Sequence, residues 1–169
     1  NINATGKIAL DHDSIILAAV DRSNRDPGLP GGEGNAGSIN ITSGDINLNN
    51  QSLIIAGTSN KGDAGNIKIN STGNISLDTG SKIVTATGSE GITGQVEGNA
   101  GKIDITANSI SLNDFSVIGA NTNRRVVIGT AGDINITTAN NLSLTNGSII
   151  SALTENKDDA GDINIKAQN

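Results

Sequence analysis

The chain repeats one pattern five times, and this repeat restricts the possible folds more than any other feature of the sequence. Each copy begins with an Ala-Gly pair, and the five pairs are Ala36-Gly37, Ala64-Gly65, Ala100-Gly101, Ala131-Gly132 and Ala160-Gly161. The Gly is followed by x-Ile-x-Ile, then by x-Ile-x-Leu or a close variant, then by Ser-x-Ile-x and a small residue. A unit of this kind cannot bury its apolar side alone, so neighbouring copies must stack on one another.

Apolar residues alternate with other residues in three segments of each copy. The first segment supplies Ile39/Ile41, Ile67/Ile69, Ile103/Ile105, Ile134/Ile136 and Ile163/Ile165. The second supplies Ile8/Leu10, Ile46/Leu48, Ile75/Leu77, Ile110/Leu112 and Leu142/Leu144, and the third supplies Ile16, Ile54, Ile83, Ile118 and Ile150, each followed two residues later by a small residue. A period of two is that of a β-strand with one buried face.

The predicted fold is therefore all-β: a right-handed parallel β-helix (β-solenoid) with three strands per turn and about five turns. Successive turns pair each strand with its counterpart in parallel, so that like residues lie above one another. The composition agrees, because Phe115 is the single aromatic residue and Cys, Met and Trp are absent. Ile, Leu, Val and Ala alone must fill the interior, which requires a narrow and regular core.

We expect residues 1–169 to form a single β-solenoid segment. The chain begins and ends within a repeat, so we expect it to be a fragment of a longer repeat array. Three longer excursions fall at the same corner of the predicted coil, at residues 19–35, 86–99 and 121–130. Repeat proteins commonly place their insertions on one face in this way.

Charge and hydropathy argue against two classes of partner. The net charge is −6, and the single basic doublet, Arg124-Arg125, is no substitute for the basic stripe that nucleic-acid binding requires. No stretch of the sequence is predicted to span a membrane. We therefore expect neither nucleic acid nor a membrane span.

The third segment differs from the others in its outward-facing residues. On the first two segments these are mostly Asn, Ser, Lys and Asp, whereas on the third they are mostly apolar. The candidate lateral contact face consists of Ile15, Leu17, Leu53, Ile55, Val84, Val117 and Ile149. Such a face is uncommon on a soluble coil. It is predicted either to lie under the excursions or to pack against another chain or surface.

Several residues carry a chemical alternative that the sequence leaves open. Asp104, Asp133 and Asp162 fall on neighbouring turns of one face, where stacked acids perturb one another's pKa. A carbohydrate-active β-helix enzyme would use such a cluster, and the competing interpretation is a solvated ladder offset by Lys68 and Lys102. A flat ice-binding face is a third alternative, for which Thr42, Thr106 and Thr137 form only a broken array.

The motifs for metal or cofactor binding are weaker than the cluster of acids. His12 lies between Asp11 and Asp13, which favour a turn as readily as they favour a metal. Calcium through Asp63, Asp158 and Asp159 is a weak possibility, because the nonapeptide of calcium β-rolls is absent. We otherwise expect no cofactor.

Two further motifs have a structural interpretation. The GxGxxG match at residues 32–37 precedes a strand instead of opening a helix, which argues against a nucleotide site. The five corner serines have no histidine partner and are predicted to form corner hydrogen bonds; they are Ser14, Ser52, Ser81, Ser116 and Ser148. Phe115 takes the corner position that Gly80 and Gly147 hold elsewhere, so we expect its ring to lie outside the coil.

The repeats resemble those of filamentous haemagglutinin-like exoproteins, especially the long ones of cyanobacteria. The resemblance is carried by the sequences of residues 34–41, 62–69 and 146–152, and it covers essentially the whole chain. It implies a large secreted or surface protein that is exported by the two-partner pathway and acts as an adhesin, a fibre or a stalk.

We therefore expect a non-catalytic structural or adhesive segment of an extracellular bacterial surface fibre. The alternative is a carbohydrate-active β-helix enzyme or carbohydrate-binding module. The expected partners are flanking repeats or further copies of the chain, end to end or side by side, and cell-surface glycans.

Overall fold

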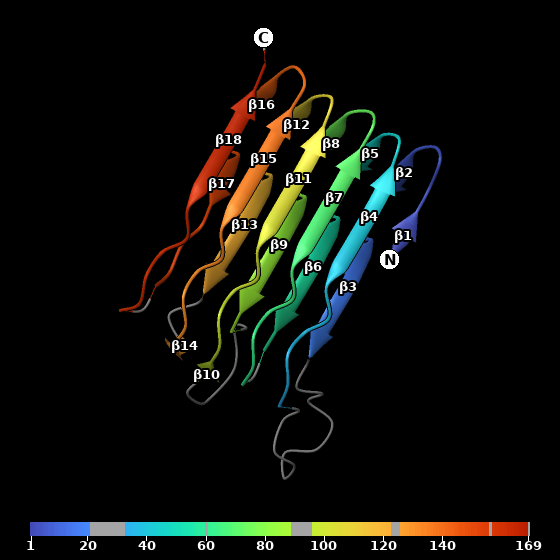
Figure 1. Cartoon of the computed structure of the whole chain (residues 1–169). Helices are drawn as coiled ribbons and strands as arrows, with labels where there is room; N and C mark the ends of the chain where they lie inside the picture. Colours follow the sequence, from blue (N-terminus) through green and yellow to red (C-terminus); the bar gives the residue numbers. More distant parts are fainter. Residues whose placement is uncertain (21–32, 60, 89–95, 123–125, 156, 169) are drawn as a thin grey trace.

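The computed structural model describes residues 1–20, 33–59, 61–88, 96–122, 126–155 and 157–168. In this part of the chain the regular structure consists of parallel β-strands that wind into a coil (Figure 1). Three sheets run along the coil, and each turn contributes one strand to each sheet. The fold is the predicted β-solenoid with three strands per turn.

The strands are assigned to the three sheets as follows. Sheet A contains β1 (Ile2–Asn3), β4 (Ile39–Ser43), β7 (Ile67–Ser71), β11 (Ile103–Ala107), β15 (Ile134–Thr138) and β18 (Ile163–Ala167). Sheet B contains β2 (Ile8–Leu10), β5 (Ile46–Leu48), β8 (Ile75–Leu77), β12 (Ile110–Leu112) and β16 (Leu142–Leu144). Sheet C contains β3 (Ile15–Val20), β6 (Leu53–Thr58), β9 (Lys82–Thr87), β13 (Val117–Thr122) and β17 (Ile149–Ser151).

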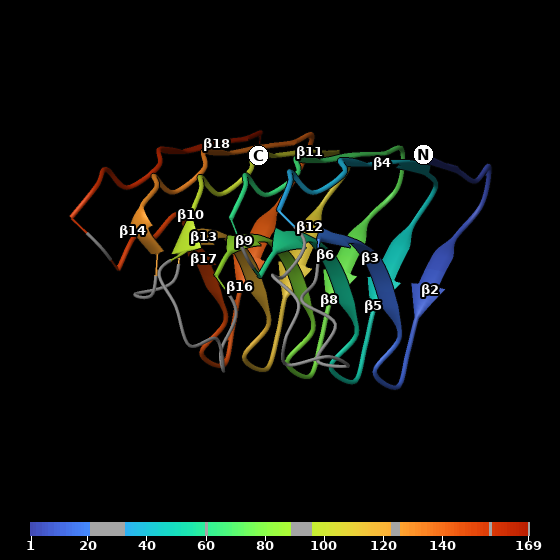
Figure 2. The same ribbon diagram turned by 90° about the horizontal axis from the view of Figure 1, so that it is seen from below.

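The coil is right-handed, as predicted. In Figure 1 the strands of sheet A lie in front and point up, the strands of sheet C lie behind and point down, and the chain advances from right to left. Figure 2 shows the same order from below, with sheet A along one side and sheets B and C on the other. Seen from the N-terminus, the chain therefore turns clockwise as it recedes.

Like residues stack on like residues along each sheet. Ile39, Ile67, Ile103, Ile134 and Ile163 are consecutive partners in sheet A. The isoleucines at the start of the sheet B strands and those of sheet C pair in the same way, which confirms the predicted register. A slip of one residue would turn each inward side chain to the solvent, so the alternating pattern itself fixes this register.

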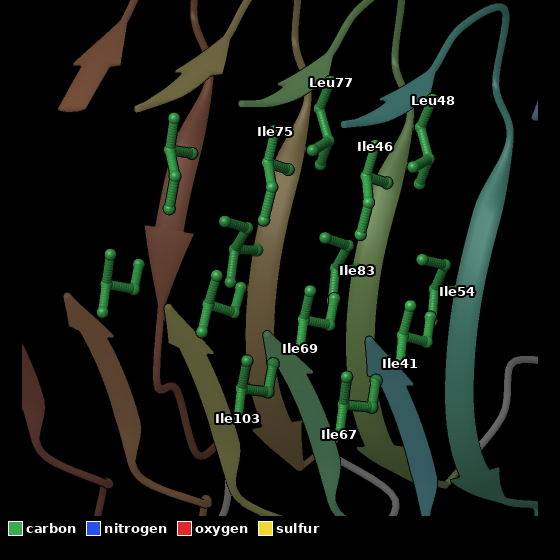
Figure 3. Packing of buried hydrophobic residues seen from close by; sticks show 14 of the residues in the cluster. Ile41, Ile46, Leu48, Ile54, Ile67, Ile69, Ile75, Leu77, Ile83 and Ile103 are labelled. Carbon is green, nitrogen blue, oxygen red and sulfur yellow. The ribbon is translucent and has the colours of Figure 1, made fainter. Parts of the chain in front are cut away.

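The core is a narrow row of aliphatic side chains between the three sheets. Figure 3 shows Ile67 and Ile103 of sheet A, Ile46 and Ile75 of sheet B, and Ile83 of sheet C directed into this space. All five are at most 1% exposed. Burial of each large aliphatic side chain contributes about 1.5–3 kcal/mol before the entropy cost, so the core residues sustain the coil without aromatic side chains.

Two features lie outside the three predicted segments. The strands β6, β9 and β13 of sheet C continue for two residues past the predicted small residue, and this places Thr58, Thr87 and Thr122 inside at 4%, 0% and 1% exposure. The second feature is a two-stranded parallel sheet of β10 (Val96–Glu97) and β14 (Val126–Ile128), next to the carboxyl ends of β9 and β13 (Figure 1). The added residues of β9 and β13 and the strands β10 and β14 belong to the segments predicted as excursions at residues 86–99 and 121–130, which are therefore shorter than the sequence pattern suggested.

Candidate functional surfaces

The Ala-Gly pairs form the corner where sheet C returns to sheet A, and there the backbones of successive turns are in direct contact. A Cβ atom placed on Gly65, Gly101, Gly132 or Gly161 would lie 2.0–2.1 Å from the carbonyl oxygen of the equivalent glycine one turn before. Because this carbonyl oxygen belongs to the backbone of the previous turn, it cannot move aside to make room for a side chain. Glycine is thus required at this position by the pitch of the coil.

A second column of glycines lies three residues before the first and consists of Gly34, Gly62, Gly98 and Gly129. In the last turn this column has a residue other than glycine. A Cβ atom on Gly62 would lie 2.1 Å from the carbonyl oxygen of Gly34, and one on Gly98 would lie 2.0 Å from that of Gly62. Gly62 and Gly98 both have positive φ. The last repeat has Asp158 at this position, and the carboxylate Oδ2 of Asp158 accepts the Gly129 N–H at 2.7 Å. In the earlier turns the equivalent N–H groups of Gly34, Gly62 and Gly98 donate to backbone carbonyls.

Polar side chains beside the glycines tie each turn to the next. The Asn35 side-chain oxygen accepts the Asp63 N–H at 2.9 Å, Asp63 accepts the Asn99 N–H at 2.8 Å, and Asn99 accepts the Thr130 N–H at 2.9 Å. In the column just before sheet A, the Asn66 side chain accepts the Lys102 N–H at 2.7 Å. These carboxylates and amides are therefore part of the structural ladder.

The three candidate acids of sheet A fall in two separate columns. Asp104 is paired with Asn135, whose amide donates to the Asp104 carboxylate at 2.9 Å, and Lys102 Nζ lies 3.2 Å from the same carboxylate. Asp133 precedes β15, and its Oδ1 accepts the Asp162 N–H at 2.9 Å. The structure thus gives Asp104 and Asp133 hydrogen-bonding partners of their own and does not pair Asp104 with either of the other acids in the strand register.

The candidate calcium ligands are likewise separated. Three steps of the corner ladder lie between Asp63 and Asp159, through Asn99 and Thr130. Among the described residues, no group of three or more His, Cys, Asp or Glu side chains has the geometry to hold a metal ion. Asp63 and the Asp158-Asp159 pair therefore lie on different turns of the coil.

The corner between sheets B and C is a tight turn with a serine at its end. Pairs of consecutive residues with positive φ occur here, such as Asn50 and Gln51 (51° and 63°) and Thr79 and Gly80 (50° and 72°). The Ser52 and Ser81 hydroxyls each donate to the carbonyl three residues before at 2.7 Å. Ser14 and Ser116 do the same, which confirms the predicted corner hydrogen bond for these four serines, and the Ser148 hydroxyl accepts the Ser116 N–H at 3.2 Å.

His12 and Phe115 lie at this corner on the outside of the coil. The His12 imidazole is 2.9 Å from the Asp11 carboxylate. The hydrogen bond from the Asn50 amide and the adjacent His12 together hold the pKa of Asp11 below its usual range. Phe115 has φ 61° and is 72% exposed, as expected for a ring outside the coil.

The apolar face lies on the outside of sheet C, as the sequence predicts. Ile15, Leu17 and Ile149 are 55%, 60% and 52% exposed, and the other members of the face, Leu53, Ile55, Val84 and Val117, are half-buried. They form two adjacent columns because Ile15 pairs with Leu53 and Leu17 pairs with Ile55. The alternative prediction, in which the excursions cover this face, involves residues 21–32, 89–95 and 123–125, which lie outside the described residues. The Arg124-Arg125 doublet is in the last of these segments and also lies outside the described residues.

Comparisons of the chain with protein-family models, with curated proteins and with solved structures found no match. Within the described residues, no helix has the length and apolarity needed to cross a membrane. The functional argument therefore depends on the surfaces of the solenoid itself.

Proposed function

We propose that this chain is a structural or adhesive, non-catalytic segment of an extracellular bacterial fibre, and that further solenoid turns stack on its open end. The observation that carries the proposal is the exposure of inward-facing residues in the last strand. Ile163 and Ile165 of β18 are 42% and 46% exposed, whereas their partners Ile134 and Ile136 in β15 are at most 1% exposed. The apolar interior is thus open at this end.

The same strand presents an unpaired edge. Within the described residues, β18 pairs on one side only, with β15. A free parallel edge is a template for pairing with another strand. An additional turn would cover Ile163 and Ile165 and satisfy the edge in one step, and either flanking repeats or a second copy of the chain can supply that turn.

The extracellular part of the proposal is supported by the resemblance of the repeats to filamentous haemagglutinin-like exoproteins. On that basis the segment would be exported by the two-partner pathway and would serve as a stalk or adhesin with cell-surface glycans among its partners. A regular rod suits this role, because length increases with each repeat while the corner contacts stay the same.

The carbohydrate-active alternative draws no support from the arrangement of the acids. Asp104 is engaged by Lys102 and Asn135, and Asp133 by the backbone of Asp162. A screen of acidic polysaccharides with an Asp133→Ala control tests this alternative. Hydrolysis or elimination that is lost in the variant would reverse our ranking.

Axial stacking is tested by electron microscopy and size-exclusion chromatography over a range of concentrations. We expect rods that lengthen along the solenoid axis as the concentration rises. The double variant Ile163→Lys/Ile165→Lys puts charge on the open interior and should shorten the rods. Its matched control is Asn164→Lys, which places a lysine on the outer side of the same strand.

Particles of one fixed length at every concentration would contradict self-stacking of this chain. Equal rod lengths for the double variant and for its control would show that the open interior is not the site of stacking.

A further inference from the structure

The corners between sheets B and C form a row along the solenoid, and the corner between β16 and β17 is the last in this row (Figure 2). It contains Asn146 and Gly147, which form the only Asn-Gly sequence in the chain. Both residues are exposed, and their φ angles are 49° and 75°. An asparagine before a glycine is chemically labile, because the glycine nitrogen has no side chain beside it to hinder its approach to the carboxamide carbon.

In the earlier corners of the row, the second residue of the positive-φ pair is hydrogen-bonded to the following turn. The N–H groups of Asp13, Gln51, Gly80 and Phe115 donate to the carbonyl oxygens of Asn50, Thr79, Asp114 and Asn146, in that order, at 2.7–3.0 Å. Gly147 is the equivalent residue of the last corner, and β16 and β17 are the last strands of their sheets. Within the described residues the Gly147 N–H therefore has no acceptor, and the nitrogen beside Asn146 is free to react.

We propose that Asn146 is a site of spontaneous deamidation, with water as the co-reactant. The Gly147 nitrogen attacks Cγ of Asn146, and the carboxamide nitrogen leaves as ammonia, which takes up the proton of the Gly147 N–H. Water then opens the cyclic imide at one of its two carbonyl carbons. The product is an aspartate or an isoaspartate at this position, and either one adds a negative charge to the chain.

Asn50 is a matched site within the same chain. Asn50 and Gln51 are exposed and have φ angles of 51° and 63°. The Asn50 carboxamide donates to the Asp11 carboxylate at 2.8 Å, as that of Asn146 donates to Asp114 at 2.7 Å. The two corners differ in the residue that follows the asparagine and in its N–H, which is bonded to the next turn in one corner and free in the other.

Packing favours glycine after Asn146. A Cβ on Gly147 would lie 2.7 Å from Cε1 of Phe115, and the φ of 75° is strained for any other residue. The labile sequence is thus a consequence of how this corner packs. A Gly147→Ala variant would disturb the corner itself, so a sharper test moves the Asn-Gly sequence to the matched site.

Deamidation would act on the contact between the last two corners. The Asn146 carboxamide donates to Oδ1 of Asp114 at 2.7 Å. After the reaction a carboxylate takes the place of this donor, so that two like charges face each other on adjacent turns, which is destabilising. Isoaspartate also lengthens the backbone of the corner. The reaction should therefore loosen the last corner of the solenoid first, where the next turn gives no support.

Peptide mapping by mass spectrometry under mildly alkaline conditions measures the reaction in the folded chain. Asn146 should convert several-fold faster than Asn50. The matched variant is Gln51→Gly, which gives Asn50 the same following residue but leaves that N–H bonded to the Thr79 carbonyl. In the folded variant Asn50 should still convert several-fold more slowly than Asn146, and in urea the two sites should convert at similar rates.

The test is made in the Ile163→Lys/Ile165→Lys background at low protein concentration. A stacked turn would give the Gly147 N–H an acceptor, and this background prevents such stacking, so the result does not depend on the function proposed above. Equal rates at Asn50 and Asn146 in the folded Gln51→Gly chain would overturn the proposal. So would an Asn146 that converts in urea but not in the folded chain.

Hydrogen exchange tests the effect on the corner. The Phe115 N–H donates to the Asn146 carbonyl at 3.0 Å, so it reports whether the last corner is closed. Asn146→Asp should make this N–H exchange several-fold faster, and Asp114→Asn/Asn146→Asp should restore slow exchange because an amide again faces a carboxylate. Unchanged exchange in Asn146→Asp, or the same increase in the double variant, would overturn the proposed loosening.

Discussion

The carbonyl oxygen of Gly65 lies directly against the Cα of Gly101, one turn further along the solenoid, so that a methyl group on Gly101 would sit 2.0 Å from that oxygen. The same contact recurs between Gly101 and Gly132 and between Gly132 and Gly161. It explains why glycine recurs at this position from turn to turn: the glycine is a point at which the backbones of successive turns are in direct contact.

The first prediction follows from this contact. Gly101→Ala should lower the free energy of unfolding by about 3 kcal/mol or more, because the new methyl group meets backbone that cannot move without separating two turns. Gly37→Ala is the matched control, since a Cβ on Gly37 has Ala18 Cβ as its nearest neighbour at 3.8 Å. Urea unfolding followed by circular dichroism compares the two, and equal losses would contradict the role given to the glycine column.

The second prediction compares two isoleucines of one column. Ile103 is fully buried, so Ile103→Ala should cost about 2–5 kcal/mol through the cavity that it leaves. Ile163 is 42% exposed, and Ile163→Ala should cost about 1 kcal/mol. Denaturation midpoints measured at a low protein concentration, where axial stacking is minimal, test this ranking. A loss at Ile163 as large as that at Ile103 would show that the end of the coil is covered.

The third prediction concerns the first corner. The Asn50 amide donates to the Asp11 carboxylate at 2.8 Å and is the main reason why the pKa of Asp11 is lowered. A carboxylate whose pKa is lowered by folding stabilises the protein above its unfolded pKa, and this contribution is lost as the pH falls through the folded pKa. Asn50→Ala should therefore raise the pKa of Asp11 and make the first turn less sensitive to acid.

Carbon-13 NMR titration of the Asp11 carboxyl measures this directly. His12→Ala should also raise the pKa, since the charge and the hydrogen bond of the His12 side chain add to the effect of Asn50. An unchanged Asp11 pKa in Asn50→Ala would refute the assignment.

The fourth prediction uses the Phe115 ring. A Cβ on Gly147 would lie 2.7 Å from Cε1 of Phe115, so the ring of one turn lies over the glycine of the next. Gly147→Ala should cost more in the parent chain than in a Phe115→Gly background, with a coupling of about 1 kcal/mol in a double-mutant cycle. Phe115→Gly alone should be neutral or slightly stabilising, because Phe115 is 72% exposed and has φ 61°. Additive effects would show that the ring does not rest on Gly147.

The alternating isoleucines were sufficient to predict the sheets, their register and the inward-facing residues. This worked because each strand has only two faces and because each repeat contains the same three strands, so a single pattern determines every turn. The outward apolar residues of sheet C, such as Leu17 and Val84, follow from the same alternation.

The corners were harder to predict because their structure depends on backbone contacts between turns and not on the alternation of apolar residues. The continuation of sheet C to Thr58, Thr87 and Thr122 keeps the period of two, but the repeated pattern ends at the small residue two positions earlier. Inside, the Thr87 hydroxyl donates to the Asn99 carbonyl at 2.7 Å, which makes a buried polar residue acceptable. The strands β10 and β14 gave no such signal, since each is short and, in the part of the chain that the structure describes, is paired with the other and with no strand of the three main sheets.

The acids show the limit of reasoning from the sequence about the site. Asp104 is the third residue after the glycine of its Ala-Gly pair, whereas Asp133 and Asp162 are the first, and this offset of two residues puts them in separate columns. That offset places Asp104 beside Asn135 and makes Asp133 an acceptor for the backbone of the next turn. The repeat alignment gives these columns, but the hydrogen bonds that engage Asp104 and Asp133 are seen only in the structure.

The most direct test of the solenoid is a disulfide ladder along the outside of sheet A. Lys68 and Asp104 are directly paired on adjacent strands, and Asn135 is paired with Asp104 one turn further on. The account predicts that Lys68→Cys/Asp104→Cys forms an intramolecular disulfide readily and that Lys68→Cys/Asn135→Cys does not, because two strand spacings, about 9.6 Å, exceed the reach of the bond. Equal cross-linking of the two pairs, or none in the first, would contradict the stacking of like residues on which the whole description depends.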